Sequence, residues 1–213
     1  MKTVMCFGDS QTWGYIPGTG ERMPYEKRWP GVLQQNVGND IRIIEEALSG
    51  RTTIWDDAFL PDRNGRTVLP VLLESHSPMD LFILMLGGND LQTYRGLKAT
   101  EAARGCRSLI QIVQKSRCGP KKGIPQILLI APPIKGQVCG FQKMLTYGAA
   151  EEESPKIPGL YEQIAKFCGC RFFDSNKVVK ASEIDGVHID ENEHHKLGLA
   201  LKDFVIDILN SAS

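Results

Sequence analysis

The sequence contains 213 residues, of which 42% are hydrophobic and 23% charged, a composition typical of a folded globular protein. One core can serve a chain of this length, so we expect a single domain over residues 1–213. Lysine plus arginine equals aspartate plus glutamate at 25 each, which excludes the basic surface that nucleic acid or an anionic membrane requires.

Segments with strand-like and helical spacing alternate along the chain. A strand is predicted at residues 3–7, then a helix at 30–37, a strand at 41–45, a helix at 68–75 and a strand at 81–86. The second half continues with a helix at 100–115, a strand at 126–131, a helix at 158–167, a strand at 171–173 and a helix at 191–209.

Short apolar strands that alternate with helices predict an α/β fold, a three-layer α/β/α sandwich around a five-stranded parallel sheet. The flavodoxin-like strand order 2-1-3-4-5 is the natural one, and it gathers functional groups at the carboxyl ends of the strands. The first apolar run, at residues 3–7, is too short for a signal-peptide core or a membrane span. We therefore predict a cytoplasmic protein without a membrane partner.

Two connections, at residues 11–29 and 132–155, are longer than most loops in a fold of this kind. The first contains Trp13 and Tyr15, and the second contains Phe141 and Met144. Such apolar insertions form pocket walls, lids or subunit contacts, and they favour a homo-oligomer over a monomer.

Six cysteines occur in a chain that is large enough to be stable without cross-links. The Cys168-Gly-Cys170 segment lacks the two-residue gap and the second pair of a typical zinc site. We expect free thiols, no bound metal and no cofactor. The cysteines are Cys6, Cys106, Cys118, Cys139, Cys168 and Cys170.

Polar motifs follow three of the predicted strands, and a fourth motif lies late in the chain. Because these motifs should meet at one sheet edge, a serine could find there a base, a carboxylate and several amide donors for an oxyanion. The motifs are Gly8-Asp9-Ser10, Ser49-Gly50-Arg51, Gly87-Gly88-Asn89-Asp90 and Asp185-Gly186-Val187-His188.

In these four ordered motifs the chain resembles the SGNH/GDSL hydrolases over nearly its whole length. The resemblance implies that Ser10 is the nucleophile, and that Asp185 and His188 complete a Ser-His-Asp triad. It also implies an oxyanion hole formed by the backbone amides of Ser10 and Gly50 and the side chain of Asn89. The implied activity is that of a serine esterase.

The residues around these motifs are similar to a narrower branch, the bacterial arylesterase/acyltransferase group. The matching segments are Cys6 to Gly14, Ser49 to Thr53 and Ile130 to Pro133. This resemblance implies small acyl groups and, as in some members of the group, acyl transfer to alcohols or hydrogen peroxide. The chain departs from the family pattern at Gln11, where the family name has leucine, and we expect an altered local contact there.

His188 is preferred as the base over His76, His194 and His195, because it alone has an aspartate three residues earlier in a glycine-containing loop. We expect His194 and His195 on the solvated face of the last helix, and His76 without a carboxylate neighbour other than Glu74.

Several neighbours of the motifs have structural interpretations. Asp9 should hold its turn through backbone amides, and Asp90 should cap or terminate an element. Arg51 could bind an anionic substrate, but an ion pair with Glu45, Glu46 or Asp56 is the simpler expectation. Trp13 and Tyr15 are candidate substrate-binding walls, or alternatively core or interface aromatics.

The main alternative function is a flavodoxin-like binding or phosphoacceptor domain with no esterase activity. The segment from Ser10 to Gly14 is poor in the small residues that wrap a phosphate, and Asp9 lacks a second acidic neighbour for magnesium. An α/β-hydrolase fits poorly as well, because no Gly-x-Ser-x-Gly motif is present.

Overall fold

A parallel β-sheet forms the middle layer of the computed structural model, which describes residues 1–138 and 140–211 but not the side chains of residues 142 and 143. Its strands pair in the order β2-β1-β3-β4-β5, and every pair is parallel. The predicted α/β fold and the order 2-1-3-4-5 are thereby confirmed. The strands are β1 (Lys2–Gly8), β2 (Ile41–Ala47), β3 (Leu81–Met85), β4 (Gln126–Ala131) and β5 (Arg171–Asp174).

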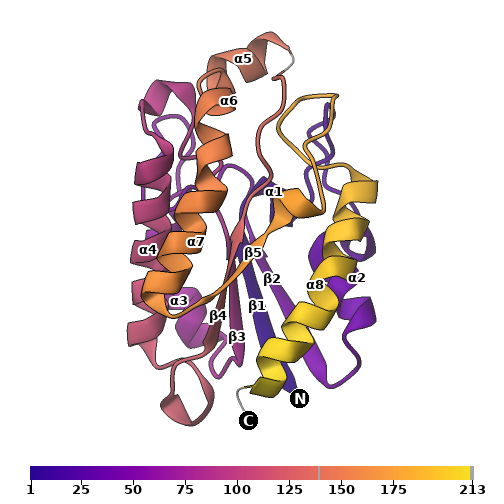
Figure 1. Cartoon of the computed structure of the whole chain (residues 1–213), viewed down its shortest axis with the longest axis vertical. Helices are drawn as coiled ribbons and strands as arrows, with labels where there is room; N and C mark the ends of the chain where they lie inside the picture. The colour runs from indigo at the N-terminus through magenta and orange to yellow at the C-terminus, as the bar shows by residue number, and fades with distance from the viewer. Residues whose placement is uncertain (139, 212–213) are drawn as a thin grey trace.

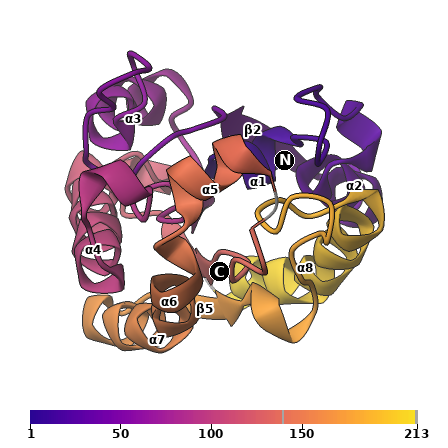
Figure 2. The ribbon, with the colours of Figure 1, turned by 90° about the horizontal axis from the view of Figure 1, so that it is seen from above.

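Helices cover both faces of this sheet (Figures 1 and 2). On one face lie α2 (Trp29–Asn36) and α8 (Glu191–Ser211). On the other lie α3 (Gly65–Ser75), α4 (Ala99–Ser116) and α7 (Ile157–Cys168). Each of these helices begins and ends within a few residues of its predicted bounds.

The two long connections contain short helices rather than irregular loops. The first includes α1 (Ser10–Trp13) and the 3-10 turn η1 (Tyr25–Lys27), and the second includes α5 (Phe141–Tyr147), α6 (Ala150–Glu153) and η4 (Ser154–Lys156). Figure 1 shows α5 and α6 beyond the carboxyl ends of the strands. Further 3-10 turns are η2 (Thr93–Arg95), η3 (Pro120–Lys122) and η5 (Ser175–Lys177).

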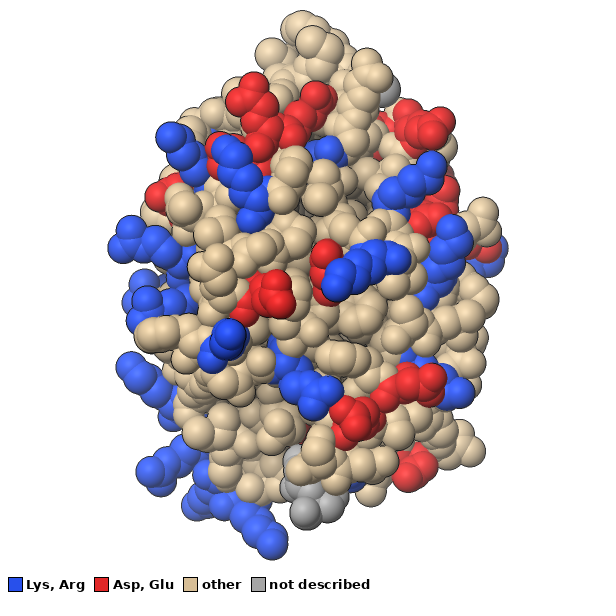
Figure 3. Space-filling model, viewed as in Figure 1, with Lys and Arg blue, Asp and Glu red and all other residues tan. Residues whose placement is uncertain are grey.

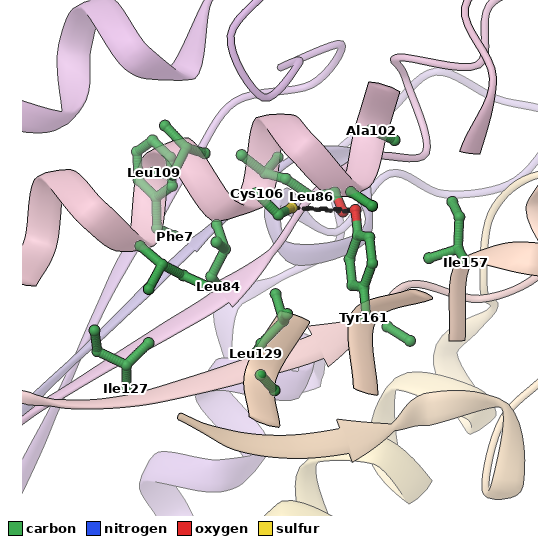
Figure 4. Close-up of a cluster of buried hydrophobic side chains, with 14 of the residues drawn as sticks. Phe7, Leu84, Leu86, Ala102, Cys106, Leu109, Ile127, Leu129, Ile157 and Tyr161 are labelled. Atoms are coloured by element: carbon green, nitrogen blue, oxygen red, sulfur yellow. Dashed lines mark hydrogen bonds between the residues drawn. The ribbon is translucent and has the colours of Figure 1, made fainter. Parts of the chain in front are cut away.

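Two apolar cores form because side chains alternate across each strand. In β1, Met5 and Phe7 pack toward α3, α4 and α7, whereas Val4 and Cys6 pack toward α2 and α8. Figure 4 shows part of the first core, where Tyr161 turns its hydroxyl inward. This hydroxyl donates to the carbonyl of Leu86 (2.8 Å) and accepts from the thiol of Cys106 (3.1 Å), so the buried polar atom is satisfied.

The cysteines of the described residues are free thiols. Cys6, Cys106 and Cys118 are buried, whereas Cys168 and Cys170 are partly buried. Cys139 lies outside the described residues.

Charges of both signs are distributed over the face seen in Figure 3. Within residues 1–138 and 140–211, every helix is too short or too polar to cross a membrane.

Close contact between α2 and α8 depends on a glycine. A methyl group at Gly198 would lie 2.6 Å from Cβ of Val32 and 2.9 Å from the carbonyl oxygen of Trp29. Gly159 in α7 is also helical, but a methyl group there would have no neighbour within 4 Å.

We predict opposite effects of the same substitution at these two glycines. Gly198→Ala should lower the free energy of unfolding by about 1–3 kcal/mol, because the added methyl separates the two helices. Gly159→Ala should raise it by up to about 1 kcal/mol, because alanine favours helix without a clash. Urea unfolding measures the free energy of unfolding of both variants. An equal change in the two variants relative to wild type would contradict the packing argument.

Candidate active site

The four sequence motifs meet at the carboxyl edge of the sheet. The side-chain nitrogen of Asn89 lies 3.1 Å from Oδ2 of Asp9 and 3.0 Å from the carbonyl oxygen of Arg51. Asn89 therefore joins the ends of β1 and β3 to the turn after β2. That turn contains Gly50, whose φ of +82° suits glycine.

Ser10 is the first residue of α1, directly after β1. The preceding Asp9 caps this short helix, because its Oδ1 accepts from the backbone amide of Gln11 (3.0 Å). Asp9 holds the turn as expected. The hydroxyl of Ser10 lies 3.0 Å from Nε2 of His188.

The loop before α8 brings Asp185 and His188 together. Oδ2 of Asp185 lies 2.7 Å from Nδ1 of His188, and Oδ1 accepts from the backbone amides of Val187 and His188 at 2.9 Å each. Gly186 makes this turn with φ of +68°, and a Cβ there would lie 2.1 Å from the carbonyl oxygen of Gln137. A larger residue would displace the loop.

The electrostatics of this loop favour an ionised Asp185. Burial alone would raise the pKa of Asp185, but the hydrogen bonds from His188 and from the two backbone amides hold it well below its usual range. Asp185 therefore stays charged near neutral pH, and a charged carboxylate fixes the Nδ1–H tautomer of His188.

Gln11 reaches the same loop from α1. Its side-chain nitrogen donates to the carbonyl of Val187 (2.7 Å), and its side-chain oxygen accepts from the amide of Ile189 (3.1 Å). The altered local contact expected at this departure from the family pattern is thus a pair of hydrogen bonds around His188.

Tyr147, at the end of α5 in the second insertion, contacts the site. It is buried, and its hydroxyl donates to Oδ1 of Asn89 (2.6 Å) and accepts from the side chain of Gln92 (3.3 Å). No sequence pattern reveals this contact, because it joins an insertion to a motif 58 residues away.

Lys135 is a second residue that sequence reasoning missed. It is buried, its ammonium lies 3.4 Å from the carbonyl oxygen of Val187, and it stands 5.2 Å from the ring centre of Tyr147. Burial raises the pKa of Asp9, and the positive charge of Lys135 opposes this shift. A lysine at the fourth position after a buried strand is usually exposed, so the sequence carried no signal.

The two candidate pocket aromatics differ in their contacts. Tyr15 stacks on the imidazole of His188, with ring centres 4.0 Å apart and planes 22° apart. Trp13 instead lies beneath the guanidinium of Arg22, at 4.9 Å from its ring centre.

The predicted surroundings of three other residues, Arg51, His194 and His76, were wrong. Arg51 is buried over the ring of Phe7, and it donates to the carbonyls of Gly8 (3.0 Å) and Glu46 (2.6 Å) instead of to a carboxylate. Arg22 and Arg28 pair with Glu45 in its place.

The two histidine corrections have simple causes. His194 is buried, because it lies where α8 packs on α2 and its Nδ1 accepts from the backbone amide of Trp29 (3.2 Å). His76 has a carboxylate neighbour other than Glu74, since Nε2 lies 2.7 Å from Glu46. His195 is exposed as expected.

Phe141 and Met144 are exposed, which argues against pocket walls packed around Ser10 among the interpretations of the second insertion. Their side chains are 72% and 59% exposed on α5.

Within the described residues, no group of three or more histidine, cysteine, aspartate or glutamate side chains could hold a metal ion.

Asp90 anchors the segment after β3. It is buried and accepts from the backbone amide of Thr53 (2.9 Å) and from the Thr53 hydroxyl. Burial raises the pKa of Asp90 to about 6, against the lowering effect of these hydrogen bonds. The structural interpretation of Asp90 agrees with these contacts.

We predict that Asp90 makes the protein less stable as pH rises from 4 to 7. The folded state holds the Asp90 proton up to about pH 6, whereas the unfolded chain releases it near its ordinary pKa. Stability should therefore fall by up to roughly 3 kcal/mol relative to Asp90→Asn, which keeps an acceptor for Thr53. Urea unfolding of both proteins at several pH values in this range measures the difference. An equal change in the free energy of unfolding of wild type and Asp90→Asn would contradict the prediction.

The chain matches the GDSL-like lipase/acylhydrolase family over residues 6–194. A solved carbohydrate acetylesterase from Sinorhizobium meliloti is 36% identical, with a TM-score of 0.94 over 98% of this chain and 100% of that one. The aryl esterase of M. smegmatis is 35% identical, with a TM-score of 0.93 over 98% and 100%. A putative arylesterase from Agrobacterium tumefaciens is 41% identical, with a TM-score of 0.91 over 98% and 100%.

No curated protein matches the chain. The family match and the solved relatives favour the esterase over the flavodoxin-like binding domain. The chain belongs to the GDSL-like lipase/acylhydrolase family and is a carboxylic ester hydrolase.

Proposed function

We propose that this protein hydrolyses short-acyl carboxylic esters through an acyl-enzyme formed on Ser10. The observation that supports this best is the continuous hydrogen-bond chain from Ser10 through His188 to Asp185, with distances of 3.0 and 2.7 Å. Nucleophile, base and orienting carboxylate are then within reach of one another before substrate binds. Because both apolar cores pack on one sheet, we treat residues 1–213 as one catalytic domain.

In the first half-reaction the Ser10 oxygen attacks the ester carbonyl carbon while Nε2 of His188 takes the hydroxyl proton. Asp185 holds the Nδ1 proton and stabilises the imidazolium. When the tetrahedral intermediate collapses, the carbon–oxygen bond to the alcohol breaks and His188 returns its proton to that alcohol. Water then repeats the sequence on the acyl-enzyme, releasing the acid and restoring Ser10.

The oxyanion of each tetrahedral intermediate would bind to the backbone amides of Ser10 and Gly50 and to the side-chain nitrogen of Asn89. Asn89 is oriented for this by Tyr147, which fixes its oxygen, so that its nitrogen faces Asp9 and Arg51. An arriving oxyanion would compete with these two acceptors for one amide hydrogen.

A short acyl group is supported by the crowding around the proposed nucleophile. Ser10 and His188 are only 5% and 3% exposed, and Tyr15 covers one face of the imidazole. We propose Tyr15 and Trp13 as substrate-binding walls. Two of the similar proteins are a carbohydrate acetylesterase and an aryl esterase, which is consistent with acetyl esters as substrates of this chain. We also propose acyl transfer to small alcohols or hydrogen peroxide as a side reaction.

Exposed apolar side chains on α5 support a homo-oligomer. Phe141, Met144 and Leu145 are 72%, 59% and 58% exposed, and burying such a patch against a second copy would be favourable. Sedimentation velocity tests this, and a monomer at micromolar concentration would contradict it.

We predict that Ser10→Ala reduces turnover of p-nitrophenyl acetate by about 10³-fold or more, because no other hydroxyl can replace the nucleophile. The melting temperature should change little. Ser75→Ala is the control, since Ser75 is an exposed serine at the end of α3 and should keep full activity. A fluorophosphonate should label wild type at Ser10, and labelling at another serine would exclude Ser10 as nucleophile.

We predict that kcat/KM falls at least about tenfold from p-nitrophenyl acetate to the octanoate, because added methylenes cannot be accommodated beside Tyr15. Measuring acetate, butyrate, octanoate and palmitate esters checks this, and a preference for octanoate or palmitate would contradict a narrow pocket. Adding a small alcohol to the acetate reaction should divert part of the acyl product to its ester. If the alcohol leaves the yield of free acid unchanged, acyl transfer is excluded, while the proposed hydrolysis is unaffected.

A further inference from the structure

The side chain of Gln11 makes a two-point contact with the backbone on either side of His188. Its nitrogen donates to the carbonyl of Val187 at 2.7 Å, and its oxygen accepts from the amide of Ile189 at 3.1 Å. Gln11 is 2% exposed, and both bonds are buried. Water therefore does not compete with them.

These two bonds have the pattern that a neighbouring β-strand would make. A strand that pairs with a residue bonds the carbonyl before it and the amide after it, and the amide group of Gln11 bonds these same two groups around His188. Three other backbone groups of the loop also form hydrogen bonds. Asp185 accepts from the amides of Val187 and His188, and the carbonyl of His188 accepts from Ser182 (2.7 Å).

Two further groups outside the loop contact it, since the amide of Gly136 donates to the carbonyl of Gly186 (2.9 Å) and the ammonium of Lys135 lies 3.4 Å from the carbonyl oxygen of Val187. Gln11 differs from these two because it is adjacent to Ser10 in the sequence. Asp185 and Ser182 belong to the loop itself, so their bonds fix its internal shape. Gln11 belongs to α1 and directly follows Ser10. Its side chain therefore fixes where the loop lies relative to the Ser10 hydroxyl.

We propose that Gln11 is a positioning residue that sets the distance and direction between Ser10 and His188. The inference rests on the proposed roles of Ser10 and His188 in ester hydrolysis. Leucine, the residue of the family pattern at this position, has no polar atom and cannot make either bond. In this chain a polar contact at the position after the nucleophile therefore aligns the base.

The chain contains a matched control for this geometry. The side-chain nitrogen of Gln34 donates to the carbonyl of Ile41 (2.9 Å), and its oxygen accepts from the amide of Ile43 (2.8 Å). This is the same two-point contact around Arg42, at the outer strand β2 and on α2. Gln34 has no contact with the proposed catalytic groups.

The experiment compares Gln11→Leu and Gln11→Met with Gln34→Leu and wild type. We expect kcat for p-nitrophenyl acetate to fall about tenfold or more in both Gln11 variants, because a small displacement of the base slows proton transfer. KM should change less than about twofold, since His188 acts in both acylation and deacylation. Gln34→Leu should keep wild-type kcat even if its melting temperature falls.

A spectroscopic readout separates positioning from stability. In wild type the His188 Nδ1 proton, bound to Asp185, should give a low-field proton resonance. It should broaden in the Gln11 variants, whose loop is less restrained, and stay sharp in Gln34→Leu.

Wild-type kcat in folded Gln11 variants would overturn the proposal. So would an equal loss of kcat in Gln34→Leu, or unfolding of both Gln11 variants while Gln34→Leu folds, because either result assigns Gln11 to stability alone. Failure of the proposed function itself has a different signature, namely an active Ser10→Ala protein.

Discussion

A single buried carboxylate, that of Asp9, connects the parts of the candidate active site. One of its oxygens caps α1 and so fixes the residue that follows β1, while the other accepts from the side chain of Asn89 at the end of β3. The first bond is local to the turn after β1, whereas the second joins the ends of two neighbouring parallel strands, which end side by side at this edge of the sheet. Through this carboxylate the turn that contains Ser10 and the turn that contains Asn89 are hydrogen-bonded to one another.

The location of this carboxylate has an electrostatic cost that neighbouring groups reduce. Burial raises the pKa of Asp9, and Lys135 and Arg51 lower it together with the Gln11 amide. Arg51 is itself buried, and desolvation lowers its pKa to about 10 in spite of Glu46 and Asp9 nearby. Two buried cations around one buried anion are stable only when their hydrogen bonds are also satisfied. Arg51 meets this condition only in part: one terminal nitrogen donates to the backbone carbonyls of Gly8 and Glu46, whereas its buried Nε has no hydrogen-bond partner among the described residues.

The sequence predicted the elements from their short-range periods, and the sheet order and the meeting of the four motifs from the common topology of five-stranded parallel folds. Strand and helix periods identify the elements, and right-handed crossovers bring the carboxyl ends of the strands together. The contacts of Tyr147 and Lys135 could not be predicted in this way, since both lie in the insertion at 132–155, whose path obeys no period. The burial of His194 was missed because the contact between α2 and α8 depends on three-dimensional packing.

The motifs and the insertions contribute different properties to the site: the motifs supply the hydrogen-bonded groups, and the insertions supply the groups that cover them. The motif residues at the strand ends take their geometry from the sheet, whereas the loop before α8 is held by its own hydrogen bonds and by those of Gln11. The groups that cover them come from the insertions: Tyr15 stacks on His188, and Tyr147 holds Asn89. Changes in the insertions at residues other than Gln11 can thus alter what reaches Ser10 while the hydrogen-bond chain behind it stays intact. A fold arranged in this way retains one chemistry while its substrates diverge, because loops tolerate substitution far better than buried strands do.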